Sequence, residues 1–335
     1  MDQILEALVT GAGIFWKAFW ALVFGYLISA GIQVLISRAQ MAQLLGERGP
    51  KQGALGTFFG FVSSSCSFAA IAATRSVLVK GAHPINALAF LIASTNLVIE
   101  LGIVLWLLLG WRFVAGNLLV GLLMVFYVYV LSALWFPSHL AEAAREHAEQ
   151  KQKEEGLEPQ EQAELEGSWL QKLTSLAGWK AIADAFYIEW KMVYKEILFG
   201  FTVAGFIAVF VPDNFWNALF LGSPGDSPSF LAVLENALIA PVIAFFTFIG
   251  SMGNVPLAAL LWSKNASFAG VMTFLGADLV AATVVYLRAK YYGWRYAAFV
   301  SLLLYVSMVL AGITVHYLFT VFNLVPTARP SLQEQ

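Results

Sequence analysis

Apolar residues along this chain come in long runs rather than in the short alternating patterns of a soluble protein. The runs lie near residues 14–36, 53–79, 84–109 and 113–136, and then near 187–211, 230–262, 266–287 and 296–322. Several of them exceed the roughly 18 residues that are needed to cross the hydrocarbon core of a bilayer. The pattern predicts an all-α integral membrane protein that is surrounded by the lipid bilayer.

Composition agrees with this prediction. The mean hydropathy is +0.74 and 12% of the residues are charged, against about 25% in a typical soluble domain. A formal net charge of -2 argues against a nucleic-acid partner. The single cysteine, Cys66, excludes an intrachain disulfide and a cluster of several thiolates around a metal. The sequence contains no nucleotide-binding glycine loop, HExxH motif or nucleophile elbow, so we expect no enzyme activity, no cofactor and no ATP-driven transport by this chain.

A charged stretch divides the apolar runs into two sets. Residues 137–186 contain PSHLAEAAREHAEQKQKEEGLEPQEQAELEGSW, which predicts a solvated and partly helical linker. Docking of a cytoplasmic partner on this linker is the alternative. The division gives a first membrane repeat over 1–136, the linker over 137–186, a second membrane repeat over 187–325 and a C-terminal tail over 326–335.

The two sets of apolar runs resemble each other. The stretch SCSFAAIAATRSVLVKGAHP can be laid on GSMGNVPLAALLWSKNASF with small and polar residues opposite one another, which favours the internal duplication that is common in transporters. If residues 53–79 and 230–262 are re-entrant hairpins, most lysines and arginines near the membrane, Arg288 among them, fall on the face of the linker. The positive-inside rule favours that arrangement over two further spans, although both stay open.

The preferred arrangement makes the halves two pseudo-symmetric, inverted repeats. Each repeat has three spanning helices and one broken hairpin, and the linker lies in the cytoplasm.

The first hairpin is interrupted by SSSCSF at residues 63–68. Backbone that leaves helical geometry inside a bilayer must be buried in protein or line a wet cavity, because lipid offers no hydrogen bonds. We expect the chain to turn between Ser63 and Ser67, and a half-helix to begin near Ser67 with its free N–H groups pointing at a ligand. Close helix packing through small residues is the alternative.

The second hairpin has a matching break, GSMGNVP, at residues 250–256. Asn254 is a suitable N-cap for a new helix, and Pro256 suits its first turn. Two half-helix starts that meet at the middle of the membrane predict a substrate site. The candidate substrate-binding residues are Ser63, Ser64, Ser65, Cys66, Ser67, Asn96, Ser251 and Asn254.

Acidic residues inside the apolar runs add a second kind of site. In ASTNLVIELG, Asn96 and Glu100 are four positions apart and are expected on one helix face. Asp278 in FLGADLVAAT falls near residues 94–96 when the halves are overlaid. Charges within spans are costly and usually face a cavity or a proton path. We therefore predict an ion-coupling role for Glu100 and Asp278, with structural ion pairing as the alternative.

The stretch GFVSSSCSFAAIAATRSVLVKGAHP, followed by ALAFLIASTNLVIELGIVLWLLLGW, resembles the ArsP/YraQ-like family of predicted permeases over nearly the whole chain outside the linker and tail. The resemblance implies a permease of the bacterial inner membrane, with efflux of organic arsenicals in one branch. The family's polar break corresponds to Ser64, Ser65, Cys66 and Ser67. Many members carry Cys-Ser-Cys in this break, whereas Ser64 stands at the first position here. Two substrate classes stay open. One is a metalloid that Cys66 binds as it would bind a metal ion, and the other is a harder ion, an oxyanion or a small metabolite.

The sequence thus predicts a secondary-type permease for a small ion or metalloid species. Two alternative hypotheses are a membrane scaffold that recruits a partner through the linker and a passive channel. Transport direction, coupling ion and homo-oligomerisation stay open.

Overall fold

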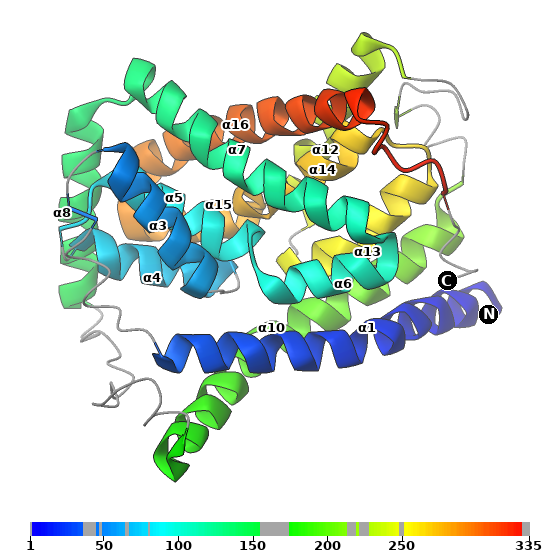
Figure 1. Cartoon of the computed structure of the whole chain (residues 1–335), viewed down its shortest axis with the longest axis horizontal. Coiled ribbons are helices and arrows are strands. Elements are labelled where there is room, and N and C mark those ends of the chain that lie inside the picture. The colour runs from blue at the N-terminus through cyan, green and yellow to red at the C-terminus, as the bar shows by residue number, and fades with distance from the viewer. Residues whose placement is uncertain are drawn as a thin grey trace.

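The computed structural model describes residues 2–35, 45–46, 49–63, 67–79, 81–154, 174–212, 219–220, 228–247 and 251–329, and is built from helices throughout these ranges (Figure 1). The first half contains α1 (Asp2–Leu35), α3 (Pro50–Ser63), α4 (Ser67–Val79), α5 (Pro84–Asn96), α6 (Ile99–Leu109) and α7 (Trp111–Trp135). The linker contributes α8 (Ser138–Glu154). The second half contains α10 (Leu176–Phe210), α12 (Phe230–Thr247), α13 (Ser251–Ser263), α14 (Phe268–Gly276), the 3-10 helix η1 (Ala277–Val280), α15 (Ala282–Tyr292) and α16 (Trp294–Val321).

Three helical stretches among the described residues are long and apolar enough to cross a membrane: Trp111–Trp135, Phe268–Tyr292 and Trp294–Val321. A fourth is the pair of α5 and α6, which is bent by 41° and passes the same test if it counts as one span. Shorter apolar stretches lie in α1, α10 and α12. The prediction of an all-helical membrane protein is confirmed at this level, while the inverted arrangement of its halves stays a prediction.

Both halves contain the same order of elements. A long helix comes first (α1 or α10), and two shorter helices follow (α3 and α4, or α12 and α13). A pair of helices with a short interruption between them (α5 and α6, or α14 and α15) then precedes another long helix (α7 or α16). In space, α1 packs along α10 and α7 packs along α16. Figure 1 shows the short helices of both halves between these two pairs of long helices.

The described helices are interrupted at the two stretches where the sequence predicts breaks. Helix α3 ends at Ser63 and α4 begins at Ser67, and α13 begins at Ser251. Ser64, Ser65 and Cys66 lie outside the described residues. The local assignment of the second break was wrong in one respect. Because α13 begins at Ser251, Asn254 lies inside the helix instead of capping it, and Pro256 also lies in the helix interior.

The C-terminal ends of α4 and α13 are built alike. Gly81, with a φ of 106°, and Asn265, with a φ of 67°, let the chain leave the helix in the left-handed region. The next residue is an alanine in both cases, and its N–H donates back into the helix. Ala82 donates to the Val77 carbonyl at 3.1 Å, and Ala266 donates to the Leu261 carbonyl at 3.0 Å.

An arginine then secures each of these two alanines. Arg145 Nη2 donates to the Ala82 carbonyl at 2.8 Å, and Arg329 Nη1 donates to the Ala266 carbonyl at 3.1 Å. Each arginine comes from the segment that follows the last long helix of its half. The glycine–asparagine, alanine and arginine pairs are all separated by 184 positions, the same separation as Ser67 and Ser251. The shared separation extends the likeness of the halves well beyond the two breaks.

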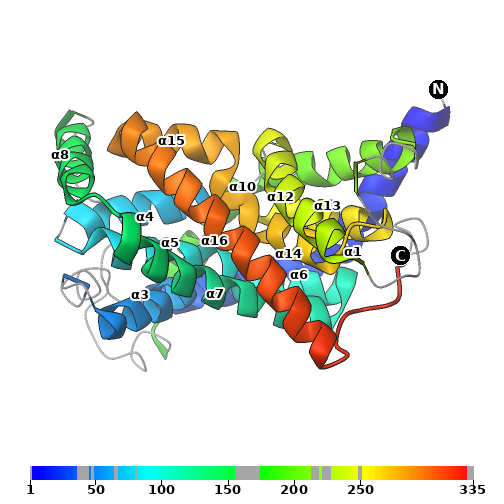
Figure 2. The ribbon, with the colours of Figure 1, turned by 90° about the horizontal axis from the view of Figure 1, so that it is seen from above.

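Helix α8 shows that the start of the linker is part of the packed structure. Ala144 and Ala148 on this helix are fully buried, and His147 Nε2 lies 3.2 Å from the Lys290 carbonyl at the end of α15. Figure 2 shows α8 at one end of the molecule, beside α4 and α15.

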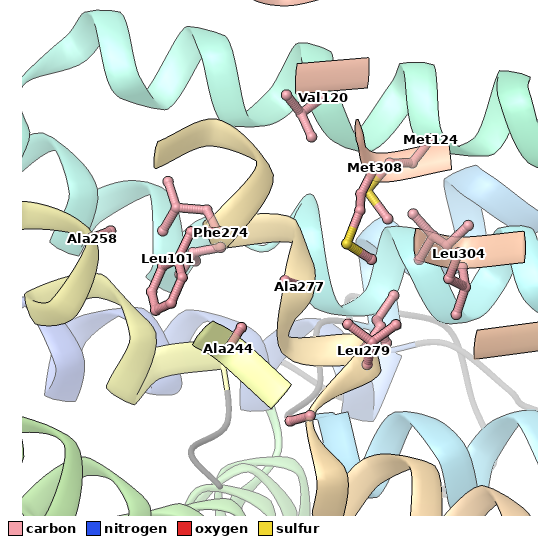
Figure 3. Close-up of a cluster of buried hydrophobic side chains, with 14 of the residues drawn as sticks. Leu101, Val120, Met124, Ala244, Ala258, Phe274, Ala277, Leu279, Leu304 and Met308 are labelled. Carbon is pink, nitrogen blue, oxygen red and sulfur yellow. The ribbon is translucent and has the colours of Figure 1, made fainter. Parts of the chain in front are cut away.

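Both halves contribute to one apolar core. Figure 3 shows Met124 of α7 beside Met308 of α16, with Phe274 of α14 nearby. Ala277 and Leu279 of η1 are part of the same buried cluster. These two apolar neighbours fix η1 in the core on either side of Asp278.

A glycine joins the last two helices of each half. Gly110 has a φ of 92° and Gly293 a φ of 85°, and each is followed by a tryptophan and an arginine that begin the long final helix. Alanine rarely adopts such a φ.

Replacing Gly293 with alanine should lower the free energy of unfolding by about 1–3 kcal/mol through backbone strain alone, since a Cβ there would meet no atom within 4 Å. The measurement is the thermal unfolding of the purified protein in detergent. Gly13→Ala is the matched control, because Gly13 lies in α1 with equally open space and should become slightly more stable. Equal stability of the two variants would contradict the assignment of strain to Gly293.

Candidate functional site

The N-termini of the two half-helices α4 and α13 meet inside the protein. Ser67 and Ser251 are the first residues of these helices, and their Oγ atoms lie 2.9 Å apart. Both side chains are buried, with 1% and 7% of their surface exposed. The hydroxyl pair therefore joins the two halves of the chain at the first residues of α4 and α13.

Asp278 completes this contact. Its Oδ2 accepts from Ser67 Oγ at 2.7 Å and from Ser251 Oγ at 2.5 Å. The side chain is fully buried, and its Oδ1 has no hydrogen-bond partner among the described residues. A carboxylate is well placed here, because the N-terminal ends of helices present free N–H groups and a positive dipole end.

The position of Asp278 depends on a break in its own span. Helix α14 ends at Gly276, η1 carries Asp278, and α15 begins only at Ala282. Gly276 faces the end of α5, since a Cβ added to it would lie 3.7 Å from Asn96 Oδ1. The C-terminal ends of α5 and α14 are therefore neighbours in space.

Arg288 supports η1 from within the same span. Its side chain is buried, with 1% of its surface exposed, while its place on the linker side of the membrane stays a prediction. Its guanidinium donates to the Leu279 carbonyl and to Ser301 Oγ, both at 3.0 Å. It thereby satisfies a carbonyl that the break of the helix leaves free. Only its place among apolar residues could have drawn attention to it.

Asn254 lies one helical turn after Ser251, on the same side of α13. The side chain is completely buried, yet neither its Nδ2 nor its Oδ1 has a hydrogen-bond partner among the described residues. A buried amide without partners costs free energy. Such a group close to the contact of the half-helices is therefore a candidate for binding a ligand.

The remaining candidate residues are placed differently. Asn96 and Glu100 do not share a helix face, because the chain bends between them: Asn96 ends α5 and Glu100 lies in the first turn of α6. Both are buried, as is Ser63. Asn117 Nδ2 donates to the Asn96 carbonyl at 2.7 Å, which satisfies one backbone group at this bend.

The site can therefore offer hydroxyl, carboxyl and amide groups to a small ligand. Within the described ranges, no three His, Cys, Asp or Glu side chains come close enough to hold a metal ion. Ser64, Ser65 and Cys66 precede Ser67 directly, but lie outside those ranges. The binding of a substrate by any of these residues stays a prediction.

Replacing Asn254 with leucine should stabilise the protein by about 1–3 kcal/mol, because it removes two buried polar atoms that lack partners. The same variant should lose transport. Asn117→Leu is the matched control, since it removes a hydrogen bond to the Asn96 carbonyl and should lower stability. Thermal unfolding of both variants in detergent measures the difference, and a destabilised Asn254→Leu would show that the amide is bonded after all.

Comparison with known proteins agrees with this architecture. The chain is 40% identical over 298 residues to "Putative permease Rv2963" of Mycobacterium tuberculosis, covering 88% of this chain and 72% of that protein. It is 30% identical over 131 residues to "UPF0718 protein YraQ" of Escherichia coli, covering 39% of this chain and 38% of that protein. No solved structure matches the chain. The family ArsP_1, described as "Predicted permease", matches residues 3–317, and the chain belongs to this family of permeases.

Proposed function

We propose that this chain is a secondary-type permease that moves a small ion or metalloid species across the bacterial inner membrane through the site between α4 and α13. The observation that carries the proposal is the convergence of two half-helix N-termini on one buried carboxylate, Asp278. Broken helices that meet in this way are a common construction of transporter sites, because unpaired backbone groups and the helix dipoles face the solute.

The halves would act as inverted repeats around this site. The features that recur at a separation of 184 positions support the duplication: the serines that begin α4 and α13, and the arginine-capped ends of the same helices. In an inverted arrangement the two arginine caps lie on opposite faces of the membrane. The linker, with α8 docked beside α4, would lie on the cytoplasmic face, in agreement with the positive-inside rule.

Substrate specificity would depend on the chemistry around Ser67. Cys66 precedes Ser67, and a thiol is a soft ligand that suits a trivalent arsenical. The hydroxyl and amide groups of Ser67, Ser251 and Asn254 would complete the contact with oxygen and nitrogen atoms. Asp278 would carry a coupling proton. A passive channel lacks such coupling, so its flux should neither saturate nor depend on pH. The flux through a proton-coupled permease should do both.

The accumulation of methylarsenite in arsenical-sensitive cells tests the proposal. Cells that express the wild-type protein should accumulate less methylarsenite than cells with an empty vector, and Cys66→Ala should remove the difference. Ser251→Ala should slow efflux about tenfold, the effect of losing one buried hydrogen bond. Ser263→Ala is the control on the same helix, since among the described residues its hydroxyl bonds the Leu260 carbonyl of that helix. At matched expression, equal accumulation in wild-type and empty cells would overturn methylarsenite as the substrate.

The scaffold alternative is tested by shortening the linker. The buried face of α8 is already occupied within this chain, so a recruiting segment would have to lie beyond it. Deleting residues 156–170, which follow α8, should leave the flux unchanged and the protein folded. Loss of flux with an intact, correctly inserted protein would favour a role for the linker in recruiting a partner.

A further inference from the structure

We propose that Asp278 carries a proton in the conformation described, that this proton closes a ring of three hydrogen bonds with Ser67 and Ser251, and that the closed ring creates a site for a small oxyanion. The inference rests on the proposed function and, for the same site, favours an oxyanion over the soft metalloid that Cys66 would suit. Its basis is a count of the protons available to three oxygen atoms.

Each pair among the three oxygens lies within hydrogen-bond distance. Ser67 Oγ and Ser251 Oγ are 2.9 Å apart, and Asp278 Oδ2 lies 2.7 Å from the first and 2.5 Å from the second. Three hydrogen bonds need three protons, but two serine hydroxyls supply only two. With an ionised carboxylate, both hydroxyls donate to Oδ2 and the contact between the serines has no proton.

A protonated carboxyl removes this deficit. The Oδ2–H then donates to one hydroxyl, that hydroxyl donates to the second, and the second donates back to Oδ2. Every oxygen gives one hydrogen bond and accepts one. When the proton leaves to water, both hydroxyls turn to the carboxylate, and the bond between Ser67 and Ser251 is lost. The protonation state of Asp278 therefore controls the contact between the two half-helices.

The charged groups around Asp278 favour an anion once the carboxyl is neutral. Helices α12, α14, α15 and α16 pack against η1. Their charged and titratable side chains, together with those of α4 and α13, are Arg75, Glu235, Tyr286, Arg288, Lys290, Tyr291, Tyr292, Arg295, Tyr296, Tyr305, His316 and Tyr317. Among these, Arg288 is bonded to the residue next to Asp278, since its guanidinium donates to the Leu279 carbonyl at 3.0 Å. When Asp278 is protonated, the carboxyl no longer balances this positive charge or the N-terminal dipole ends of α4 and α13.

Unused polar atoms beside the ring supply the contacts for a ligand. Asp278 Oδ1 and both amide atoms of Asn254 are buried and lack partners in the described structure. The amide Nδ2 can donate a hydrogen bond to an oxyanion. An ionised Asp278 would compete with the anion for the same positive environment. Protonation of Asp278 removes this competition, so the proton and the anion would bind together.

Infrared difference spectroscopy of the purified full-length protein tests the inference without a transport assay. At neutral pH the wild-type protein should show the C=O band of a protonated, buried carboxylic acid, and the band should disappear at alkaline pH. Asp278→Asn should lack the band, while Glu100→Gln, which removes the other buried carboxyl group among the described residues, should keep it. Loss of the band in Glu100→Gln instead, or its absence from the wild type at every pH, would overturn the proton ring.

Added anions test the second half of the inference. At a pH where half of the band is lost, inorganic phosphate or sulfate should restore it, whereas potassium gluconate at equal ionic strength should not. If neither phosphate nor sulfate restores the band, the oxyanion site is overturned.

A second variant guards against misfolding. Ser251→Ala keeps the carboxyl but opens the ring, so it should shift both the frequency of the band and the pH at which it disappears. Ser263→Ala should shift neither, and an unshifted Ser251→Ala would contradict the ring even if Asp278→Asn fails to fold. These readouts are independent of methylarsenite efflux, so failure of the inference and failure of the proposed function are distinguishable.

Discussion

The structure depends on hydrogen bonds to buried backbone and side-chain polar groups that neither water nor lipid can bond. A helix that stops inside a bilayer leaves N–H and C=O groups that only the protein can bond. Here α4 and α13 begin at Ser67 and Ser251, whose hydroxyls contact each other and Asp278. One carboxyl group therefore serves two helix starts from different halves. Removing that group would leave both starts without their shared partner.

The polar groups at the C-terminal ends of α4 and α13 must also be bonded within the protein, and here a positive charge does so. Carbonyl groups are left free at a helix C-terminus, where a cation is favourable. Arg145 and Arg329 bond the carbonyls of Ala82 and Ala266 just beyond α4 and α13. Each half-helix is thus held by an acid at its start and by an arginine past its end. The short helices α4 and α13 are defined units because both of their ends are tied to other parts of the chain.

The sequence alone predicts the helices well and the site only in part. Long apolar runs and the small polar residues of SSSCSF and GSMGNVP locate the spans and the breaks, since these features are local. The contact of Ser67 with Asp278 joins residues 211 positions apart, and no local pattern encodes it. For the same reason the break between Asn96 and Glu100 was read as a continuous helix. A clearer sign of duplication was present and unused, namely Gly-Trp-Arg at both 110–112 and 293–295.

The likeness of the halves makes their differences informative. At the separation that relates Ser67 to Ser251, Asp278 corresponds to Ser94, whose hydroxyl, among the described residues, bonds the Leu91 carbonyl of its own helix. Arg75, whose guanidinium lies 4.3 Å from the Tyr291 ring centroid, likewise corresponds to the buried Ala259.

Buried charge is expensive in a membrane protein and is kept where function requires it. A purely structural need for polar groups at the breaks would apply to both halves equally, because both contain the same breaks. The buried charges instead stand at positions that do not correspond in the two halves: Asp278 lies in η1 and Arg288 in α15, whereas Glu100 lies in α6. In the permease proposed above, this asymmetry would belong to the solute and its coupling ion, and the symmetry to the scaffold around them.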